Sequence, residues 1–149
     1  MRKHLPLAAV LLAGWATTAS AGPYTDDMSK CLVSSTSADD RTNLVRWIFA
    51  NAALHPDVAN ISTVTIDQRT TMNQAAGELF DRLLTVSCRK QTREALRYEG
   101  PAAIQLSFQV LGQVAMGTLM SHPSVGQGFS EFAKFVDEKK IEALKNSQD

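Results

Sequence analysis

The stretch that most constrains this chain runs over residues 37–56 and reads SADDRTNLVRWIFANAALHP. Ser37 can cap a helix there, and Asp40 can reach back to it in the pattern of a capping box. The helix should end before Pro56, because proline disfavours helical geometry in the residue that precedes it. Between these ends apolar side chains lie nearly all round the helix, which predicts burial by several neighbours. We therefore expect a central helix, with Trp47 buried in the core.

The first 21 residues have the pattern of an export signal. Arg2 and Lys3 form a basic start, an apolar run follows, and the small residues up to Ala21 match the pattern that signal peptidase reads. The apolar run is shorter than the roughly 20 residues that a spanning helix needs. We expect cleavage after Ala21, leaving residues 22–149 as a single helical domain that is periplasmic or secreted and has no membrane span.

The charge of the expected mature chain is close to zero. Loss of Arg2 and Lys3 takes the 15 basic side chains to 13 against 15 acidic ones, a net charge of −2. A chain so close to neutral has no long-range attraction for polyanions. This balance argues against nucleic acid as a general partner.

Two cysteines, Cys31 and Cys88, remain after the expected cleavage. In an exported chain two cysteines most simply form one disulfide. A redox-active or metal-binding thiol is the alternative, but neither residue belongs to a Cys-x-x-Cys motif. The structural bridge is the better interpretation.

Further amphipathic segments should pack on the central helix. They are expected at residues 26–33, 65–88, 89–99, 101–121 and from 124 towards the end of the chain. Thr65 and Gln68 can form a second capping box, and Gly100 should follow the end of the segment 89–99. The last of them should turn six apolar side chains to the core: Phe129, Phe132, Phe135, Val136, Ile141 and Leu144. The small residues Gly112, Ala115 and Gly117 should allow another helix to approach closely. The fold class expected is all-α, an irregular bundle of five to six helices with one disulfide.

Motifs for catalysis or cofactor binding are missing from the sequence. It has no Gly-x-Ser-x-Gly, no His-Glu-x-x-His, no phosphate-binding glycine loop and no dinucleotide-binding signature. His55 and His122 each precede a proline at a helix end, and as a pair they could bind a metal or transfer protons. The simpler interpretation is that each bonds the last carbonyls of its helix. We therefore expect no enzyme activity, catalytic residue, metal or cofactor.

One surface feature points to binding. Arg89, Arg93 and Arg97 recur every four residues, so they form one stripe on a helix, with Tyr98 beside it. Like charges at this spacing repel one another by a few tenths of a kcal/mol per pair. A solvated face with local ion pairs, such as Lys90 with Glu94 and Glu94 with Arg97, is the alternative to a partner-binding surface.

Two runs carry a resemblance: CLVSSTSADDRTNLVRWIFANAALHPDV and SCRKQTREALRYEGPAAIQLSFQVLG. They resemble a family of small exported helical proteins of proteobacteria, from which no activity carries over. In outline the chain is also similar to periplasmic immunity proteins, which are small, helical and disulfide-bonded. The resulting expectation is a non-enzymatic exported protein that binds a periplasmic protein partner, in an immunity or inhibitor role. The alternative is a small-molecule or lipid carrier with a cavity between the central helix and the helix that starts at Pro101.

Overall fold

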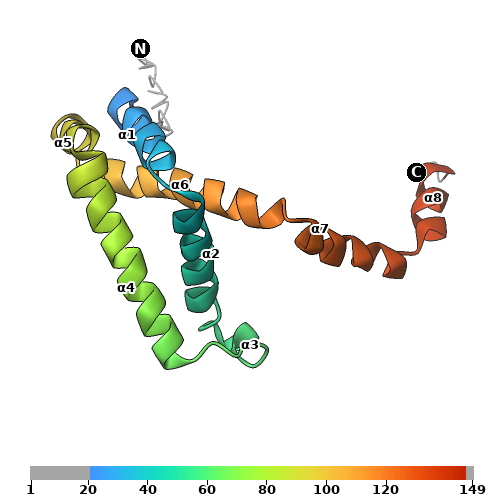
Figure 1. The fold of residues 1–149 in the computed structure, drawn as a ribbon. Helices are drawn as coiled ribbons and strands as arrows, with labels where there is room; N and C mark the ends of the chain where they lie inside the picture. Colours follow the sequence, from blue (N-terminus) through green and yellow to red (C-terminus); the bar gives the residue numbers. More distant parts are fainter. Residues whose placement is uncertain (1–20, 147–149) are drawn as a thin grey trace, which may run out of the picture.

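The computed structural model describes residues 21–146, and over these residues the chain is all-helical (Figure 1). The α-helices are α1 (Pro23–Ser34), α2 (Ala38–Ala52), α3 (Pro56–Ala59), α4 (Ile66–Arg82), α5 (Arg89–Tyr98), α6 (Ala102–Met120), α7 (Pro123–Ser130) and α8 (Glu138–Asn146). A π-helical turn, η1 (Leu83–Ser87), follows α4, and a 3₁₀ turn, η2 (Glu131–Phe135), follows α7. The expected all-α class is confirmed, but the expected five to six helices are too few for the described residues. The one-turn helix α3 and the division of the last helix into α7, η2 and α8 account for the difference. The predicted signal peptide lies outside the described residues up to residue 20 and remains a prediction.

The local signals at two helix starts are confirmed. At α2 the Asp40 N–H donates to Ser37 Oγ at 3.0 Å, and the Ser37 N–H donates to an Asp40 carboxylate oxygen at 2.8 Å. At α4 Thr65 and Gln68 exchange the equivalent pair of hydrogen bonds, at 3.2 and 2.9 Å. Both capping boxes involve residues three apart, so the sequence alone specifies them.

The two histidines play a different part from the one expected. Each lies at the start of the next helix, and its ring Nδ1 accepts a backbone N–H: from Asp57 to His55 at 3.3 Å, and from Ser124 to His122 at 3.3 Å. Each histidine does bond a carbonyl in the last turn of the preceding helix, but through its backbone N–H: His55 to Ala52 at 3.0 Å and His122 to Leu119 at 3.1 Å. The ring of each histidine instead serves the helix that follows. Proline at the first helical position leaves the next N–H in need of an acceptor, which the ring nitrogen supplies.

Cys31 and Cys88 form the predicted disulfide, with their sulfur atoms 2.04 Å apart and their Cα atoms 5.8 Å apart. The turn η1 brings Cys88 to this position, since its N–H donates to the Leu83 carbonyl, five residues back, at 2.8 Å. In a regular α-helix two residues five apart would differ by about 140° in direction. The wider π turn reduces this angle, so both Leu83 and Cys88 are fully buried.

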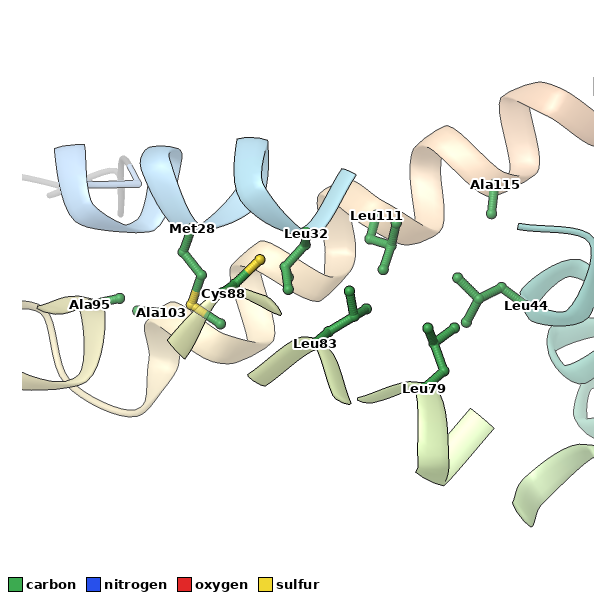
Figure 2. Close-up of a cluster of buried hydrophobic side chains, with 10 residues drawn as sticks. All are labelled: Met28, Leu32, Leu44, Leu79, Leu83, Cys88, Ala95, Ala103, Leu111 and Ala115. Atoms are coloured by element: carbon green, nitrogen blue, oxygen red, sulfur yellow. The ribbon is translucent and has the colours of Figure 1, made fainter. Parts of the chain in front are cut away.

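The core lies where α6 meets α1, α2 and α5. Figure 2 shows its buried side chains converging from α1, α2, α4, η1 and α6, with Leu83 and Leu111 near the middle. The buried apolar members are Met28, Leu32, Leu44, Leu79, Leu83, Cys88, Ala95, Ala103, Leu111 and Ala115. The helix with the most neighbours is thus α6.

The helix expected to be central, α2, is only partly covered. It packs on α4 and α6, and Leu44 and Ala50 are its only buried residues. Phe49 is 60% exposed, and Trp47 is half-buried, with its Nε1–H donating to Asn73 Oδ1 at 2.9 Å. The prediction of a surrounded central helix is wrong, because two neighbours cannot cover an apolar surface that extends round the whole helix.

The helix α6 is apolar along most of its length, yet much of its surface is open. By length and composition alone it could cross a membrane, with a mean hydropathy of 1.2 and 22% of the tested window buried. Its buried residues, among them Ser107, Leu111 and Ala115, face α1, α2 and α5, as in a core helix of a folded protein. A Cβ placed on Gly112 or Gly117 would meet nothing within 4 Å. The expectation that these glycines allow close helix packing is therefore wrong.

The C-terminal arm, which we define as α7, η2 and α8, leads away from the rest of the molecule (Figure 1). Of the described elements, α7 touches only α6 and η2, and α8 packs on none. The six apolar side chains that were expected to face the core are all exposed: Phe129, Phe132, Phe135, Val136, Ile141 and Leu144. The three phenylalanines do lie in helical segments, but Val136 is extended and interrupts the single last helix that was expected. None of the described elements of the core covers these six side chains.

Candidate functional site

Helix α5 carries the predicted binding residues and is held at both ends. It begins directly after Cys88, which is bonded to α1, and it ends at Gly100, whose φ of +81° is the left-handed conformation that favours glycine. Between these ends Ala95 is fully buried and Thr92 is 9% exposed, on the side that faces the rest of the fold. The opposite side of α5 is therefore presented to solvent on a fixed support.

All four predicted partner-binding residues lie on this exposed side, on one helix: Arg89, Arg93, Arg97 and Tyr98. The three arginines border a shallow groove together with Leu84, Thr85, Thr92 and Leu96. The groove thus combines three cations with apolar side chains from α5 and η1. Leucine side chains beside arginine forks suit a protein surface that offers both carboxylates and apolar groups.

Among the described residues, the three arginines of the stripe have no acidic partner. Lys90 and Glu94 approach to 4.0 Å as expected, but within the described residues no carboxylate lies within 4.0 Å of the guanidinium groups of Arg89, Arg93 or Arg97. The expected Glu94–Arg97 contact is not formed. Three like charges at four-residue spacing therefore repel one another without compensation inside the fold.

Tyr98 connects the groove to α1. Its ring stacks on Tyr24 with centroids 4.6 Å apart, and the Arg97 guanidinium carbon lies 5.5 Å from the Tyr98 centroid. A cation over an aromatic face is attracted by the ring quadrupole. This contact restricts the position of Arg97 while leaving its nitrogens available.

The next residue, Glu99, provides a contact that sequence reasoning missed. Its carboxylate accepts the N–H groups of Tyr24 at 2.9 Å and Thr25 at 2.8 Å, together with the Thr25 hydroxyl. The Thr25 hydroxyl and the two N–H groups hold the pKa of Glu99 below its usual range, although partial desolvation opposes them. Glu99 therefore caps α1, whose own cap position is Gly22 and offers no side chain.

The carbonyl of Thr25 joins this contact to α6. It accepts hydrogen bonds from Ser29 Oγ at 2.8 Å and from the fully buried Ser107 Oγ at 3.1 Å. The start of α1 is thus bonded to the end of α5 and to the middle of α6. No local sequence signal marks this contact, because its partners are more than seventy residues apart.

The described residues in and around the groove include one buried hydroxyl without a partner and no cluster of metal-binding side chains. Thr92 Oγ1 is the one buried side-chain polar atom that lacks a hydrogen-bond partner in the described part of the chain. Over those same residues no group of three or more histidine, cysteine or acidic side chains could hold a metal ion. The groove offers cations, hydroxyl groups and apolar side chains, and the Tyr98 ring lies beside Arg97 next to it. All of these groups suit a protein ligand.

Comparison with known proteins gives no relative from which a function could be inferred. No family model, curated protein or solved structure matches this chain. The resemblance to small exported proteobacterial proteins stays a prediction. The case for function therefore depends on α5 and its surroundings.

Proposed function

We propose that this protein acts after export by binding an acidic surface of a partner protein through the groove on α5, in an immunity or inhibitor role. The observation that carries this proposal is the set of exposed and unpaired guanidinium groups of Arg89, Arg93 and Arg97. A solvated helix face normally pairs its charges locally, as Lys30 and Asp27 do at 3.4 Å on α1. In the α5 stripe the three guanidinium groups repel one another without a nearby carboxylate, and carboxylates of a bound partner would offset this repulsion.

The attachment of α5 to the rest of the fold at both ends also favours a role in binding a partner. The disulfide and the Glu99 contact fix α5 at both ends, so little backbone entropy is lost when the helix engages a partner. The alternative, a carrier with a cavity between α2 and α6, has less support. Leu44, Leu111 and Ala115 are buried where these helices meet, so side chains occupy that space (Figure 2).

Charge reversal of the stripe tests the proposal. The mature protein with Arg89→Glu, Arg93→Glu and Arg97→Glu should lose its partner in pull-downs from periplasmic extract, after cross-linking and mass spectrometry have identified that partner with the wild type. Its melting temperature should change by less than about 4 °C, because exposed charges contribute little to stability.

A matched control separates the stripe from net charge. Arg46→Glu, Lys139→Glu and Lys145→Glu make the same change in charge at exposed positions on α2 and α8. This control should retain the partner. Equal retention by both triple variants would show that the stripe is only a solvated face. Cross-links that map away from α5 would place the binding surface elsewhere.

A further inference from the structure

The C-terminal arm has an aromatic stripe that its own chain leaves uncovered. Phe129, Phe132 and Phe135 are 60%, 67% and 89% exposed. A 3₁₀ turn has three residues per turn, so η2 aligns Phe132 with Phe135, and Phe129 precedes them by one turn of α7. Exposed aromatic side chains in a row are typical of the centre of a protein interface.

Exposed apolar side chains also lie near the end of α6, the helix that leads into the arm. Met116 and Met120 are exposed and lie four residues apart, on one side of the helix. Only Ser121 and His122 separate α6 from α7, and the His122 ring caps α7. This short capped connection directs the arm away from α1–α5, so none of these described helices covers the surface (Figure 1).

The area and charge of this surface fit association with a copy of itself. A phenylalanine buries about 150–250 Å², so the exposed parts of the three rings offer roughly 300–550 Å². A standard interface takes about 800 Å² from each partner; the three rings supply roughly half of that area, and the exposed parts of Met116, Met120 and Ile141 add to it. On the arm, Lys134 pairs with Glu131 and Lys140 with Asp137, each at 3.6 Å, so the arm carries no block of one charge.

We propose that the second copy of a homodimer covers this surface, with the end of α6 and the arm of each chain packed antiparallel about a twofold axis. A twofold interface brings the same patch of both copies together, so one aromatic stripe supplies both halves. Two nearly neutral chains do not repel each other. The proposal does not depend on the α5 groove, because the 19 residues of α6 place the arm about 28 Å from the end of α5.

Light scattering coupled to size exclusion tests the proposal on the mature, oxidised chain at tens of micromolar. The wild type should have the mass of two chains. The variant Phe129→Ser, Phe132→Ser and Phe135→Ser should have the mass of one chain. Its dimer dissociation constant should rise at least about 100-fold, because buried aromatic residues contribute most of the binding free energy at interfaces. Its helical circular dichroism should be retained.

The control changes equally exposed apolar residues elsewhere. Ile61→Ser and Ile66→Ser alter side chains that are 81% and 77% exposed, near the turn between α3 and α4, and should leave the dimer intact. A one-chain mass for the wild type, or a dimer that survives the triple serine change, would overturn the proposal. So would a wild type that stays monomeric and co-sediments with phosphatidylethanolamine–phosphatidylglycerol vesicles, since a membrane would then be the occupant. Unfolding of the triple variant would also contradict it, because the arm would then be packed within the single chain.

Discussion

The part of the chain from α1 to α6, here called the body, and the C-terminal arm use the same kind of sequence pattern with opposite results. In the body, apolar residues at helical spacing such as Leu79 and Leu83 are buried. In the arm, Phe132 and Phe135 have equally clear spacing and remain exposed. The difference is that α4 packs on α2 and η1 packs on α1 and α5, whereas among the described elements η2 touches only α7. Periodicity indicates which side of a helix needs a partner, but it does not say that the same chain provides one.

Loss of the disulfide should have the largest effect, and it should be confined to the body. The variant Cys31→Ser, Cys88→Ser removes a bridge that spans 57 residues, for which chain entropy gives about 4 kcal/mol of unfolding free energy. Its melting temperature should fall by many degrees. Thiols that react with an alkylating agent in the native, unreduced wild type would show instead that the bridge is not formed.

A pair of truncations compares the two regions directly. Leu111→Ala in the core should cost about 2–5 kcal/mol, whereas Phe132→Ala on the arm should cost below about 0.5 kcal/mol in single chains. Denaturant unfolding at protein concentrations low enough to exclude dimers measures both. Similar costs for the two changes would mean that the arm packs on the body.

The Glu99 contact should make the stability of the body depend on pH. Its folded pKa is lowered, chiefly by the hydrogen bond from Thr25, so the stabilisation is complete above the unfolded value of about 4.5. It is lost as pH falls through the folded pKa. Below pH 4.5 the melting temperature of the wild type should therefore fall more steeply than that of Glu99→Gln. The exposed arm residue Glu142 supplies the control, since Glu142→Gln should follow the wild type; parallel curves for wild type and Glu99→Gln would rule out the contact.

Two glycines give the smallest expected effect. A Cβ meets nothing within 4 Å at Gly117 in α6 or at Gly126 in α7. Gly117→Ala should stabilise the body by up to about 1 kcal/mol, because alanine favours the helix and lowers the entropy of the unfolded chain. Gly126→Ala should increase helicity without raising the melting temperature of the body. A destabilising Gly117→Ala would mean that another helix does approach there.

Sequence reasoning was successful where the interacting residues are close in the chain. The capping boxes at Ser37 and Thr65 involve residues three apart, and Gly100 was correctly placed after the end of a helix. Two cysteines leave only one intrachain pairing, which is why the bridge was predictable. The arginine stripe depends on helical spacing alone, so its placement on one exposed side of α5 was also predictable.

Reasoning failed where a residue meets a partner distant in sequence. The Glu99 carboxylate bonds Tyr24 and Thr25 across more than seventy residues, and nothing near Glu99 indicates it. The apolar character of α2 was read as burial on every side, yet the fold supplies only α4 and α6 as neighbours. The arm was assigned to the core for the same reason. In each case the pattern was real, and the missing information was the position of the other elements.

Hydrogen–deuterium exchange read by mass spectrometry tests the contrast between body and arm most directly. The triple serine variant of Phe129, Phe132 and Phe135 keeps the measurement on single chains. We expect amides in α1, α4 and α6 to be protected by several orders of magnitude, since they open only with the core. Amides of residues 123–146 should exchange within roughly tenfold of an unstructured peptide, because among the described elements α7 touches only the end of α6 and η2, and α8 packs on none. Protection of the arm equal to that of α6 would contradict this account, because it would require a packed core that includes the arm.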